Sequence, residues 1–509
     1  MLPEVGKELV PICDMDSCSD SVFCVHFETL GCRLNQIESE SAAKCFSEAG
    51  FSVDMEAVSA SCELSEAVLC VVNTCTVTGK AEQKARRLIR LLLRKYPKSC
   101  VLVTGCYAQL NPKEIESLDP RICVLPGSRK DLLAEFPKKL MAFLCSVPDG
   151  SLPEVDSTVG FIRGLTRCVS VEDLSARFTP KNAFRLSTDS FLVHSRSSVK
   201  IQDGCNNSCS YCRIRLARGN SVCLDASCVV ERVQNLERQG QHEVVLTGVN
   251  LSQYRSKHKD GFVDLACLLS LLIESTNKIR FRLSSLHPET VSDLFCQIIR
   301  NPRVQPHFHL SVQSGSDRIL GHMGRSYNRE CVLAAVEKLR AAKENPFVAC
   351  DMIVGFPGET DEDFEETMDL CLRANFSWVH AFPFSPRPGT KAFSMKPVVP
   401  QSIVAKRISR LTEFAIESKC AYISLWSGKV VTAVTELSRS DRSTKGVCSV
   451  PMTHGVTENF LHVELPQKIP SGSLVHVRII EPLVSRIRRG DECEATAHVV
   501  HDEKGVFCS

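Results

Sequence analysis

This 509-residue sequence has little net charge, no apolar run long enough to span a membrane and no signal-peptide pattern. Its formal net charge is only +2, so overall charge argues neither for nor against a polyanionic partner. Its most apolar stretch, VDLACLLSLLIEST, is too short to span a bilayer. The N-terminal residues include acids and lack the long apolar core of a signal peptide. These absences indicate a cytoplasmic protein, and they leave any contact with nucleic acid to local patches of charge.

Cysteine, in contrast, is abundant, with 27 residues in the chain. Without an export signal, reduced thiols and metal ligation are favoured over disulfides. The stretch IQDGCNNSCSYCRIRLARG places Cys205, Cys209 and Cys212 in the spacing C-x3-C-x2-C. Zinc and iron–sulfur sites usually take four protein ligands, but the next histidine is His242, beyond an expected helix. The spacing therefore favours a [4Fe–4S] cluster with one open iron over a structural zinc site.

A second group of three cysteines emerges from the pattern of residues 22–145. Val- and Leu-rich strands alternate there with helices, which indicates a parallel sheet covered on both faces. The strands VFCVHFETLGC, AVLCVVNTC and SCVLVTGC end at Cys32, Cys75 and Cys106. Because the carboxyl ends of parallel strands line one edge of an open sheet, where ligands bind, these thiols are predicted to meet there. Three independent buried cysteines are the alternative on this pattern alone.

The rest of the chain predicts two further units. Strand–helix alternation returns six times from about 197 to 420, which predicts an incomplete (β/α)6 barrel of the TIM type with its chemistry at the carboxyl ends of the strands. Short strands separated by turn residues follow, which predicts a small all-β barrel. The fold class is therefore α/β with a C-terminal β-barrel. We expect an N-terminal extension, an open parallel α/β sheet domain, a linker, the partial barrel and the small β-barrel at residues 1–21, 22–145, 146–195, 196–422 and 423–509.

The cysteine motif resembles that of one superfamily. The spacing C-x3-C-x2-C with Tyr211 before the last cysteine, at the first strand end of a partial barrel, is similar to the radical S-adenosylmethionine enzymes. Within that superfamily, the segments TLGCRLNQIESE, VVNTCTVT, TGCYAQ, LTGVNLSQY, LSVQSGSDRIL, DMIVGFPGET and FPFSPRPGT resemble the signature segments of the methylthiotransferases. The family order is also an N-terminal sheet domain, a radical barrel and an RNA-binding TRAM β-barrel. The resemblance covers nearly all of residues 22–500.

The resemblance implies the cofactors and their ligands. S-adenosylmethionine would bind the open iron of the cluster held by Cys205, Cys209 and Cys212, where the cofactor carries the radical chemistry. Cys32, Cys75 and Cys106 would hold a second, auxiliary [4Fe–4S] cluster that supplies the inserted sulfur. One S-adenosylmethionine would methylate that sulfur and another would generate the radical. The residues implied to contact S-adenosylmethionine are Tyr211, Gly248, Asn250, Ser284, Ser285, Gln313, Ile353, Val354 and Gly355.

The segments near the cysteines resemble one branch of the family most closely. This branch acts on N6-threonylcarbamoyladenosine at position 37 of tRNA and adds a methylthio group at C2 of adenine. The implied partners are a tRNA anticodon stem-loop, an electron donor and a sulfur source, and we expect a monomer. Alternatives are the branch acting on isopentenyladenosine in tRNA, the branch acting on a ribosomal protein, and an RNA-binding protein with metal sites and no catalysis. That last alternative predicts four ligands at each site rather than three.

Overall fold

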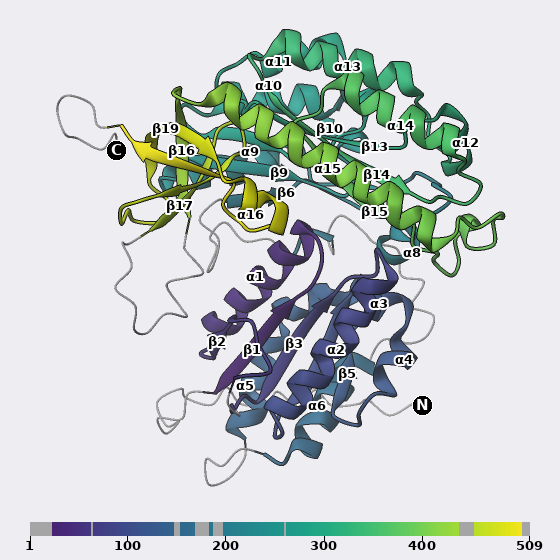
Figure 1. Ribbon diagram of the computed structural model, residues 1–509. Coiled ribbons are helices and arrows are strands. Elements are labelled where there is room, and N and C mark those ends of the chain that lie inside the picture. Colours follow the sequence, from purple (N-terminus) through teal and green to yellow (C-terminus); the bar gives the residue numbers. More distant parts are fainter. Residues whose placement is uncertain are drawn as a thin grey trace.

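The structure is a computed structural model that describes residues 23–62, 65–146, 153–167, 183–186, 197–258, 261–436 and 452–500. The expected extension at 1–21 lies outside these ranges. Figure 1 shows three units in chain order: a sheet with flanking helices, a partial barrel, and a small β-barrel at the C-terminal end. None of the helices in the described ranges is both long enough and apolar enough to cross a membrane.

A five-stranded parallel sheet forms the N-terminal unit, in the order β2-β1-β3-β4-β5. Its central strands β3 and β4 are buried at every position, as continuous apolar strands covered on both faces must be. The two edge strands, each only three residues long, were not expected from the sequence. The strands are β1 (Cys24–Thr29), β2 (Ser52–Asp54), β3 (Leu69–Thr74), β4 (Cys100–Gly105) and β5 (Ile122–Val124).

Helices cover both faces of this sheet. One apolar cluster joins the sheet to α1, α5 and α6, and another joins it to α2, α3 and α4. These elements are α1 (Arg33–Glu48), α2 (Gly79–Lys95), α3 (Cys106–Leu110), α4 (Pro112–Glu116), the 3-10 helix η2 (Gly127–Ala134), α5 (Phe136–Cys145) and α6 (Val155–Arg167).

Helix α6 corrects the expectation of an irregular linker at 146–195. Val159 and Ile162, one helical turn apart, are buried in the same cluster as α1 and α5. The described part of the predicted linker therefore packs onto the N-terminal unit. Residues 147–152, 168–182 and 187–196 of that segment lie outside the described ranges.

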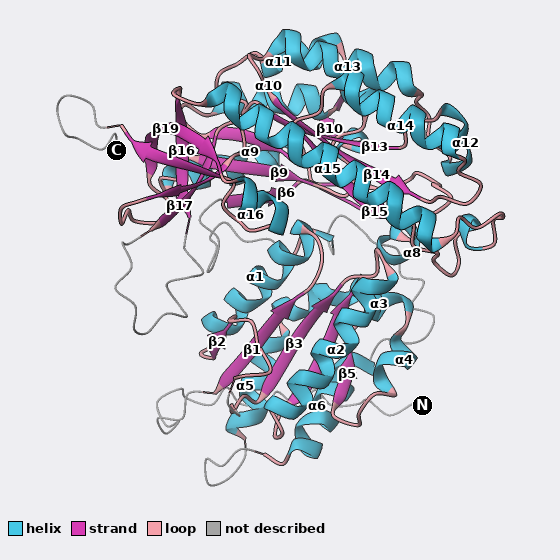
Figure 2. Ribbon diagram, viewed as in Figure 1, coloured by secondary structure: helices cyan, strands magenta, loops and turns pink. Residues whose placement is uncertain are grey.

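The six expected strands of the central unit are present in the expected order. They form two three-stranded parallel sheets, β12-β9-β6 and β13-β14-β15, joined by isolated bridges between Phe281 and Val304 and between Leu286 and Leu310. Figure 2 shows these strands with helices on their outer side. The strands are β6 (Ser197–Lys200), β9 (Glu243–Thr247), β12 (Arg280–Leu283), β13 (His307–Gln313), β14 (Phe347–Val354) and β15 (Trp378–Pro383).

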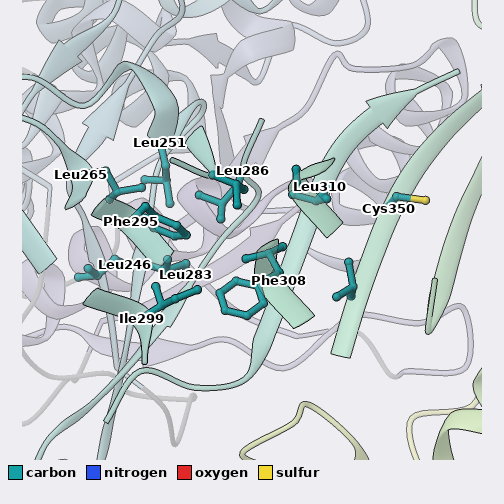
Figure 3. Packing of buried hydrophobic residues seen from close by; sticks show 14 of the residues in the cluster. Leu246, Leu251, Leu265, Leu283, Leu286, Phe295, Ile299, Phe308, Leu310 and Cys350 are labelled. Atoms are coloured by element: carbon teal, nitrogen blue, oxygen red, sulfur yellow. The ribbon is translucent and has the colours of Figure 1, made fainter. Parts of the chain in front are cut away.

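The outer face of these strands packs against the surrounding helices. Figure 3 shows Phe308, Leu310 and Cys350 of the sheet among the leucines and Phe295 of this core. The helices are α8 (Ile214–Arg218), α9 (Ala226–Arg238), α10 (Leu265–Ser275), α11 (Asp293–Ile299), α12 (Asp317–Met323), α13 (Arg329–Ala342), α14 (Asp361–Ala374) and α15 (Gln401–Trp426). Shorter elements are β7 (Gln202–Asp203), β8 (Val222–Cys223), η5 (Leu251–Gln253), β10 (Ser256–His258), β11 (Gly261–Val263), η6 (Pro288–Thr290) and η7 (Lys391–Phe393).

A closed five-stranded barrel forms the C-terminal unit, in the order β16-β17-β18-β20-β19 with β19 pairing back to β16. Its elements are β16 (Val430–Glu436), β17 (Thr453–Thr457), β18 (His462–Leu465), β19 (Leu474–Pro482), α16 (Val484–Arg489) and β20 (Ala495–Val499). The small β-barrel was expected, but the short helix α16 was not. The expected strand VCSVP lies outside the described residues.

The C-terminal barrel closes the amino-terminal end of the central barrel. The ring of Phe460 stacks on His307 at the start of β13, with centroids 3.9 Å apart. Arg282 of β12 donates to the carbonyl oxygens of Thr457 and Glu458 at 3.1 and 3.2 Å. Its carboxylate partner is the equally buried Glu243, 2.7 Å away. At the opposite, carboxyl-terminal edge of the central strands, Arg213 and Arg387 contact Glu82 and Thr76 of the N-terminal unit.

Candidate iron–sulfur and S-adenosylmethionine site

The N-terminal triad, Cys32, Cys75 and Cys106, lies where the sequence pattern placed it. Cys75 directly follows β3 and Cys106 directly follows β4, while Cys32 precedes α1 after the end of β1. Thr74 and Gly105, the residues before two of these cysteines, are paired in register across the two strands. The strand register therefore brings the loops of Cys75 and Cys106 next to each other.

Two glycines allow the three loops to approach closely. A Cβ on Gly31 would lie 2.7 Å from the Cβ of Cys75, and a Cβ on Gly105 would lie 2.3 Å from the carbonyl oxygen of Thr74. Both glycines also have positive φ, at 117° and 97°, which side-chain-bearing residues rarely adopt. Only glycine fits both positions, so the residues preceding Cys32 and Cys106 serve the convergence of the N-terminal triad.

The barrel triad, Cys205, Cys209 and Cys212, lies in the loop after β7 and before α8. Backbone N–H groups point at two of its sulfurs: that of Asn207 lies 3.4 Å from Cys205 Sγ and that of Ile214 lies 3.5 Å from Cys212 Sγ. Hydrogen bonds to cysteine sulfur stabilise thiolates and tune the reduction potential of a bound cluster. The loop is thus folded with donors already aimed at its sulfur atoms.

In each triad, burial and the charge of neighbouring thiols raise the pKa of a cysteine. Burial raises the pKa of Cys212 to about 11, with Cys209 and Cys205 adding to the effect. Burial likewise raises the pKa of Cys75 to about 11, with Cys106 and Cys32 adding to it. Thiols with such pKa values hold their protons near neutral pH, so metal binding to either triad releases protons.

Arg325 brings a positive charge to the barrel triad. Its Nη1 lies 3.6 Å from Cys209 Sγ, and its guanidinium carbon lies 6.0 Å from the centre of the Tyr211 ring. The Arg325 Nε is buried without a hydrogen-bond partner. A buried cation with a spare donor suits an anionic group at this site. Arg325 lies 116 residues from Cys209 in the chain, so no local pattern predicted its place beside the barrel triad.

The predicted S-adenosylmethionine contacts lie mostly at one edge of the central unit. Gly248 and Asn250 follow β9, Ser284 and Ser285 follow β12, Gln313 ends β13, and Ile353, Val354 and Gly355 stand at the end of β14. Tyr211 lies in the triad loop and packs in an apolar cluster with Ile353 and Phe384. The side chain of Val354 instead belongs to the core between strands and helices, so only its backbone is available at the edge.

Three of these residues show how the edge is built. Asn250 Nδ2 lies 3.9 Å from Cys205 Sγ, and the Asn250 backbone N–H donates to Gln202 Oε1 at 2.8 Å. A Cβ on Gly248 would approach that same Gln202 oxygen to 2.9 Å, so glycine makes room for it. The hydroxyl oxygen of Ser284 is buried with no hydrogen-bond partner. Because buried polar groups are normally paired, Ser284 is suited to a polar group of a bound cofactor.

A bridge of hydrogen bonds connects the two triads. Thr76 and Arg213 each directly follow a triad cysteine, and both contact the Glu82 carboxylate, with Arg213 Nη1 at 3.2 Å. Arg387, after β15, donates to Thr76 Oγ1 at 3.1 Å and also to Glu82. Figure 1 shows α8, which follows Arg213, beside α3 at the junction of the two units. The two triads therefore belong to a single interface, which the sequence could not reveal because these partners lie far apart in the chain.

The arrangement of the triad cysteines suits iron–sulfur clusters better than a single metal ion. In the described ranges, no three His, Cys, Asp or Glu side chains converge as the ligands of a single ion do. In a [4Fe–4S] cluster each cysteine binds a different iron, so its ligands stand farther apart than those of one ion. At the barrel triad, N–H groups aimed at sulfur and the nearby Arg325 suit thiolates bound to such a cluster. At the N-terminal triad, the close approach of three loops suits one.

The partial barrel and the triad loop at its first strand end define a radical S-adenosylmethionine enzyme. The model of the radical SAM superfamily matches residues 199–371, and that of Uncharacterized protein family UPF0004 matches residues 24–127. This class of enzyme uses S-adenosylmethionine and a [4Fe–4S] cluster.

Relatives identify the family. The threonylcarbamoyladenosine tRNA methylthiotransferase MtaB of Treponema pallidum is 46% identical over 467 residues, covering 85% of this chain and 95% of that protein. The tRNA-2-methylthio-N(6)-dimethylallyladenosine synthase of Endomicrobium trichonymphae is 32% identical, covering 73% and 79%. A solved structure of the radical S-adenosylmethionine methyltransferase TsrM from Kitasatospora setae is 13% identical with a TM-score of 0.47, covering 73% of this chain and 74% of that one. The chain belongs to the radical S-adenosylmethionine methylthiotransferases.

Proposed function

We propose that this chain inserts a methylthio group at C2 of the adenine of N6-threonylcarbamoyladenosine at position 37 of tRNA. The observation that carries the proposal is the pair of cysteine triads at facing strand ends of two units, joined by the Glu82 bridge. The choice of substrate within the family is supported by the similarity to the Treponema pallidum protein across most of both chains.

In this proposal each triad holds a [4Fe–4S] cluster and leaves one iron without a protein ligand. S-adenosylmethionine and the two clusters, when bound, supply the radical and the sulfur. The barrel triad residues Cys205, Cys209 and Cys212 hold the cluster that binds S-adenosylmethionine. The N-terminal triad residues Cys32, Cys75 and Cys106 hold the cluster that supplies sulfur. Neither the electron donor nor the source of sulfur belongs to this chain.

The chain itself orients the cofactor. We propose that Ser284 Oγ and Asn250 Nδ2 offer polar contacts, and that Tyr211 and Ile353 provide an apolar wall beside the barrel triad. Gly355 places its backbone at the edge in a positive-φ conformation, with φ at 79°. The remaining contacts proposed from the family motifs are Gly248, Ser285, Gln313 and the backbone of Val354.

A tRNA substrate requires a surface that attracts phosphate. Helix α2 carries exposed cations along its length, and its N-terminal end lies at the same sheet edge as the N-terminal triad. Cations on such a surface release counterions from the tRNA backbone when they bind. The C-terminal barrel is the other proposed RNA contact, and we expect the protein to act as a monomer in the cytoplasm. The exposed cations of α2 are Lys80, Lys84, Arg87, Arg90 and Arg94.

An anticodon loop also favours the chemistry. The target base must leave the loop and enter the site between the two triads, as enzymes that act on a base require. Bases in a single-stranded loop are already partly unstacked, which lowers the cost of that movement. The Glu82 bridge joins Thr76 and Arg213, which directly follow one cysteine of each triad, and so holds the two triads relative to each other.

Mass spectrometry of tRNA nucleosides tests the proposal directly. Deleting the gene is expected to remove the methylthio form of threonylcarbamoyladenosine, and the intact gene is expected to restore it. A gene carrying Cys209→Ala is expected not to restore it. Loss of a methylthio-isopentenyladenosine instead would transfer the assignment to that branch of the family. An unchanged tRNA pool with an altered ribosomal protein mass would refute a tRNA substrate.

Iron content tests the two sites independently of the substrate. After anaerobic reconstitution we expect about eight irons per chain, and about four in the Cys209→Ala variant. That variant is also expected to lose cleavage of S-adenosylmethionine while keeping the cluster of the N-terminal triad. A content of about four irons in the unmodified protein would refute the second cluster.

A further inference from the structure

Arg218, at the last position of α8, is the centre of a buried ionic network between the two units. Its Nη1 lies 3.1 Å from Glu38 Oε1 and 2.9 Å from Asp203 Oδ1, and its Nη2 donates to Asn35 Oδ1 at 2.6 Å. Glu38 and Asn35 belong to α1 of the N-terminal unit, whereas Asp203 and Arg218 belong to the central unit. The Arg218 side chain is only 2% exposed.

The described members of this network carry more positive than negative charge. Lys200 pairs with Glu38 at 2.8 Å and with Asp203 at 2.6 Å, and Lys130 pairs with Glu38 as well. The group thus holds three cations and two carboxylates. All five side chains are between 1% and 9% exposed. An excess of buried positive charge is unfavourable unless further negative charge lies nearby.

The N-terminal triad lies next to this excess positive charge. Asn35 Oδ1, which accepts from Arg218 Nη2, lies 4.0 Å from Cys32 Sγ. Helix α8, which ends at Arg218, packs against α3, which begins at Cys106. Asn35, which accepts from Arg218, also donates to the carbonyl oxygen of Thr74 at 3.1 Å, directly before Cys75. The network therefore adjoins the loops of all three cysteines.

We propose that Arg218 supplies the buried positive charge that raises the reduction potential of a cluster held by Cys32, Cys75 and Cys106. This inference rests on the proposed function, which gives the N-terminal triad a [4Fe–4S] cluster. Three thiolates on the oxidised core leave a net charge of about −1, and one-electron reduction makes it about −2. A fixed cation stabilises the more negative state, because attraction grows with charge at short range in a poorly screened interior.

The same geometry makes Arg218 the positioning residue that ties this potential to the assembled interface. The arginine belongs to the chain segment that begins at Cys212, so it moves with the barrel triad. The cluster of the N-terminal triad therefore receives the charge of Arg218 only when the central unit is docked against it. Reduction of the cluster held by the N-terminal triad is therefore coupled to the presence of the folded central unit.

The experiment uses the full chain with the barrel triad removed by Cys205→Ala, Cys209→Ala and Cys212→Ala. Every signal then comes from the N-terminal triad, which is expected to bind about four irons after reconstitution. The midpoint potential is measured by titration with dithionite, which donates the electron, and electron paramagnetic resonance of the reduced cluster. Adding Arg218→Gln is expected to keep the iron and to shift the midpoint to more negative values. Arg218→Lys, which keeps the charge, is expected to restore most of the shift.

Two further variants separate charge from damage to the fold. Glu38→Gln removes a buried negative charge from the same network, so it is expected to shift the midpoint in the opposite, more positive direction. Arg282→Gln removes an arginine that is equally buried, at 2% exposed, at the other end of the central barrel, so it is expected to leave the midpoint unchanged. A general loosening of structure would not give shifts of opposite sign.

The outcomes distinguish this inference from its premise. Absence of iron from the background variant would refute the cluster of the N-terminal triad and the inference with it. Iron retained with an unchanged midpoint in Arg218→Gln would refute the inference alone. Should Arg218→Gln fail to fold, Glu38→Gln decides the matter, because an unchanged or more negative midpoint in that variant overturns the proposed role of the network.

Discussion

Replacing Gly105 with alanine tests how closely the loops of the N-terminal triad must pack. A Cβ at this position would lie 2.3 Å from the carbonyl oxygen of Thr74, 2.6 Å from the Thr74 backbone nitrogen and 2.5 Å from Asn73 Oδ1. Two of these atoms are backbone atoms of β3, which a rotamer change cannot move. The substitution must therefore separate β3 from β4 exactly where Cys75 and Cys106 emerge.

The expected destabilisation has two parts. A residue with a side chain pays about 1–3 kcal/mol to adopt the backbone conformation of Gly105, with φ at 97° and ψ at −165°, which is almost confined to glycine. Forcing extra volume into a packed site adds about 1–3 kcal/mol. The sum is about 2–6 kcal/mol for Gly105→Ala. Gly240 is a matched control because its φ is 80° and nothing lies within 4 Å of the added Cβ, so Gly240→Ala retains only the first part.

Hydrogen exchange followed by mass spectrometry measures both effects. In Gly105→Ala we expect amides of β3 and β4 to open more easily by about 2–6 kcal/mol, whereas Gly240→Ala should affect β9 by about 1–2 kcal/mol. Iron content is expected to fall to about four per chain in Gly105→Ala and to stay near eight in the control. Unchanged protection of β3 and β4 together with full iron would refute the reasoning.

Three further predictions follow from other parts of the structure. Arg282→Ala leaves the buried carboxylate of Glu243 without its arginine partner, so the free energy of unfolding in urea is expected to fall by about 3–5 kcal/mol, and limited proteolysis should release the C-terminal barrel more readily. Burial lowers the pKa of His26, but two carboxylates outweigh it and raise that pKa to about 9 from 6.5: Asp54, hydrogen-bonded to Nδ1 at 2.8 Å, and Glu28, 3.6 Å from Nε2. The stabilisation by this histidine is therefore complete below pH 6.5 and lost as the pH rises through about 9, a dependence that His26→Gln should remove from thermal melts. Gly355→Ala would place a Cβ 2.4 Å from Val404 Cγ2, so its loss of thermal stability is expected to be partly restored by Val404→Ala, and no restoration would contradict the packing argument.

Much of the fold could be predicted from local sequence patterns. The continuous apolar strands β3 and β4 and the six strands of the central unit were expected, because their Val- and Leu-rich runs alternate with amphipathic helices. The edge strands β2 and β5, three residues each, and the six-residue helix α16 are too short for such periodicity. Helix α6 was missed because the mixed polar segment around it has weak periodicity.

The sequence by itself determined the residues of both triads. Cys205, Cys209 and Cys212 lie within eight residues, so any fold of that loop keeps them near one another. The triad of Cys32, Cys75 and Cys106 was accessible by a further step, because each cysteine ends a strand and parallel strands end at one edge of a sheet. The barrel triad follows from a local cysteine motif. The N-terminal triad follows from local strand patterns together with the rule that parallel strands end at one edge of a sheet.

Only the tertiary structure decided how the two triads are held and charged. Arg213 and Arg218 belong to a segment that by sequence resembles any exposed basic turn, yet their side chains are 10% and 2% exposed. Arg218 lies 180 residues from Glu38, its partner across the interface. Burial of such charges depends on the docking of the two units, because a charged group is acceptable in the interior only when its partner is buried with it. No periodicity or spacing in the sequence predicts the pairing of Arg218 with Glu38.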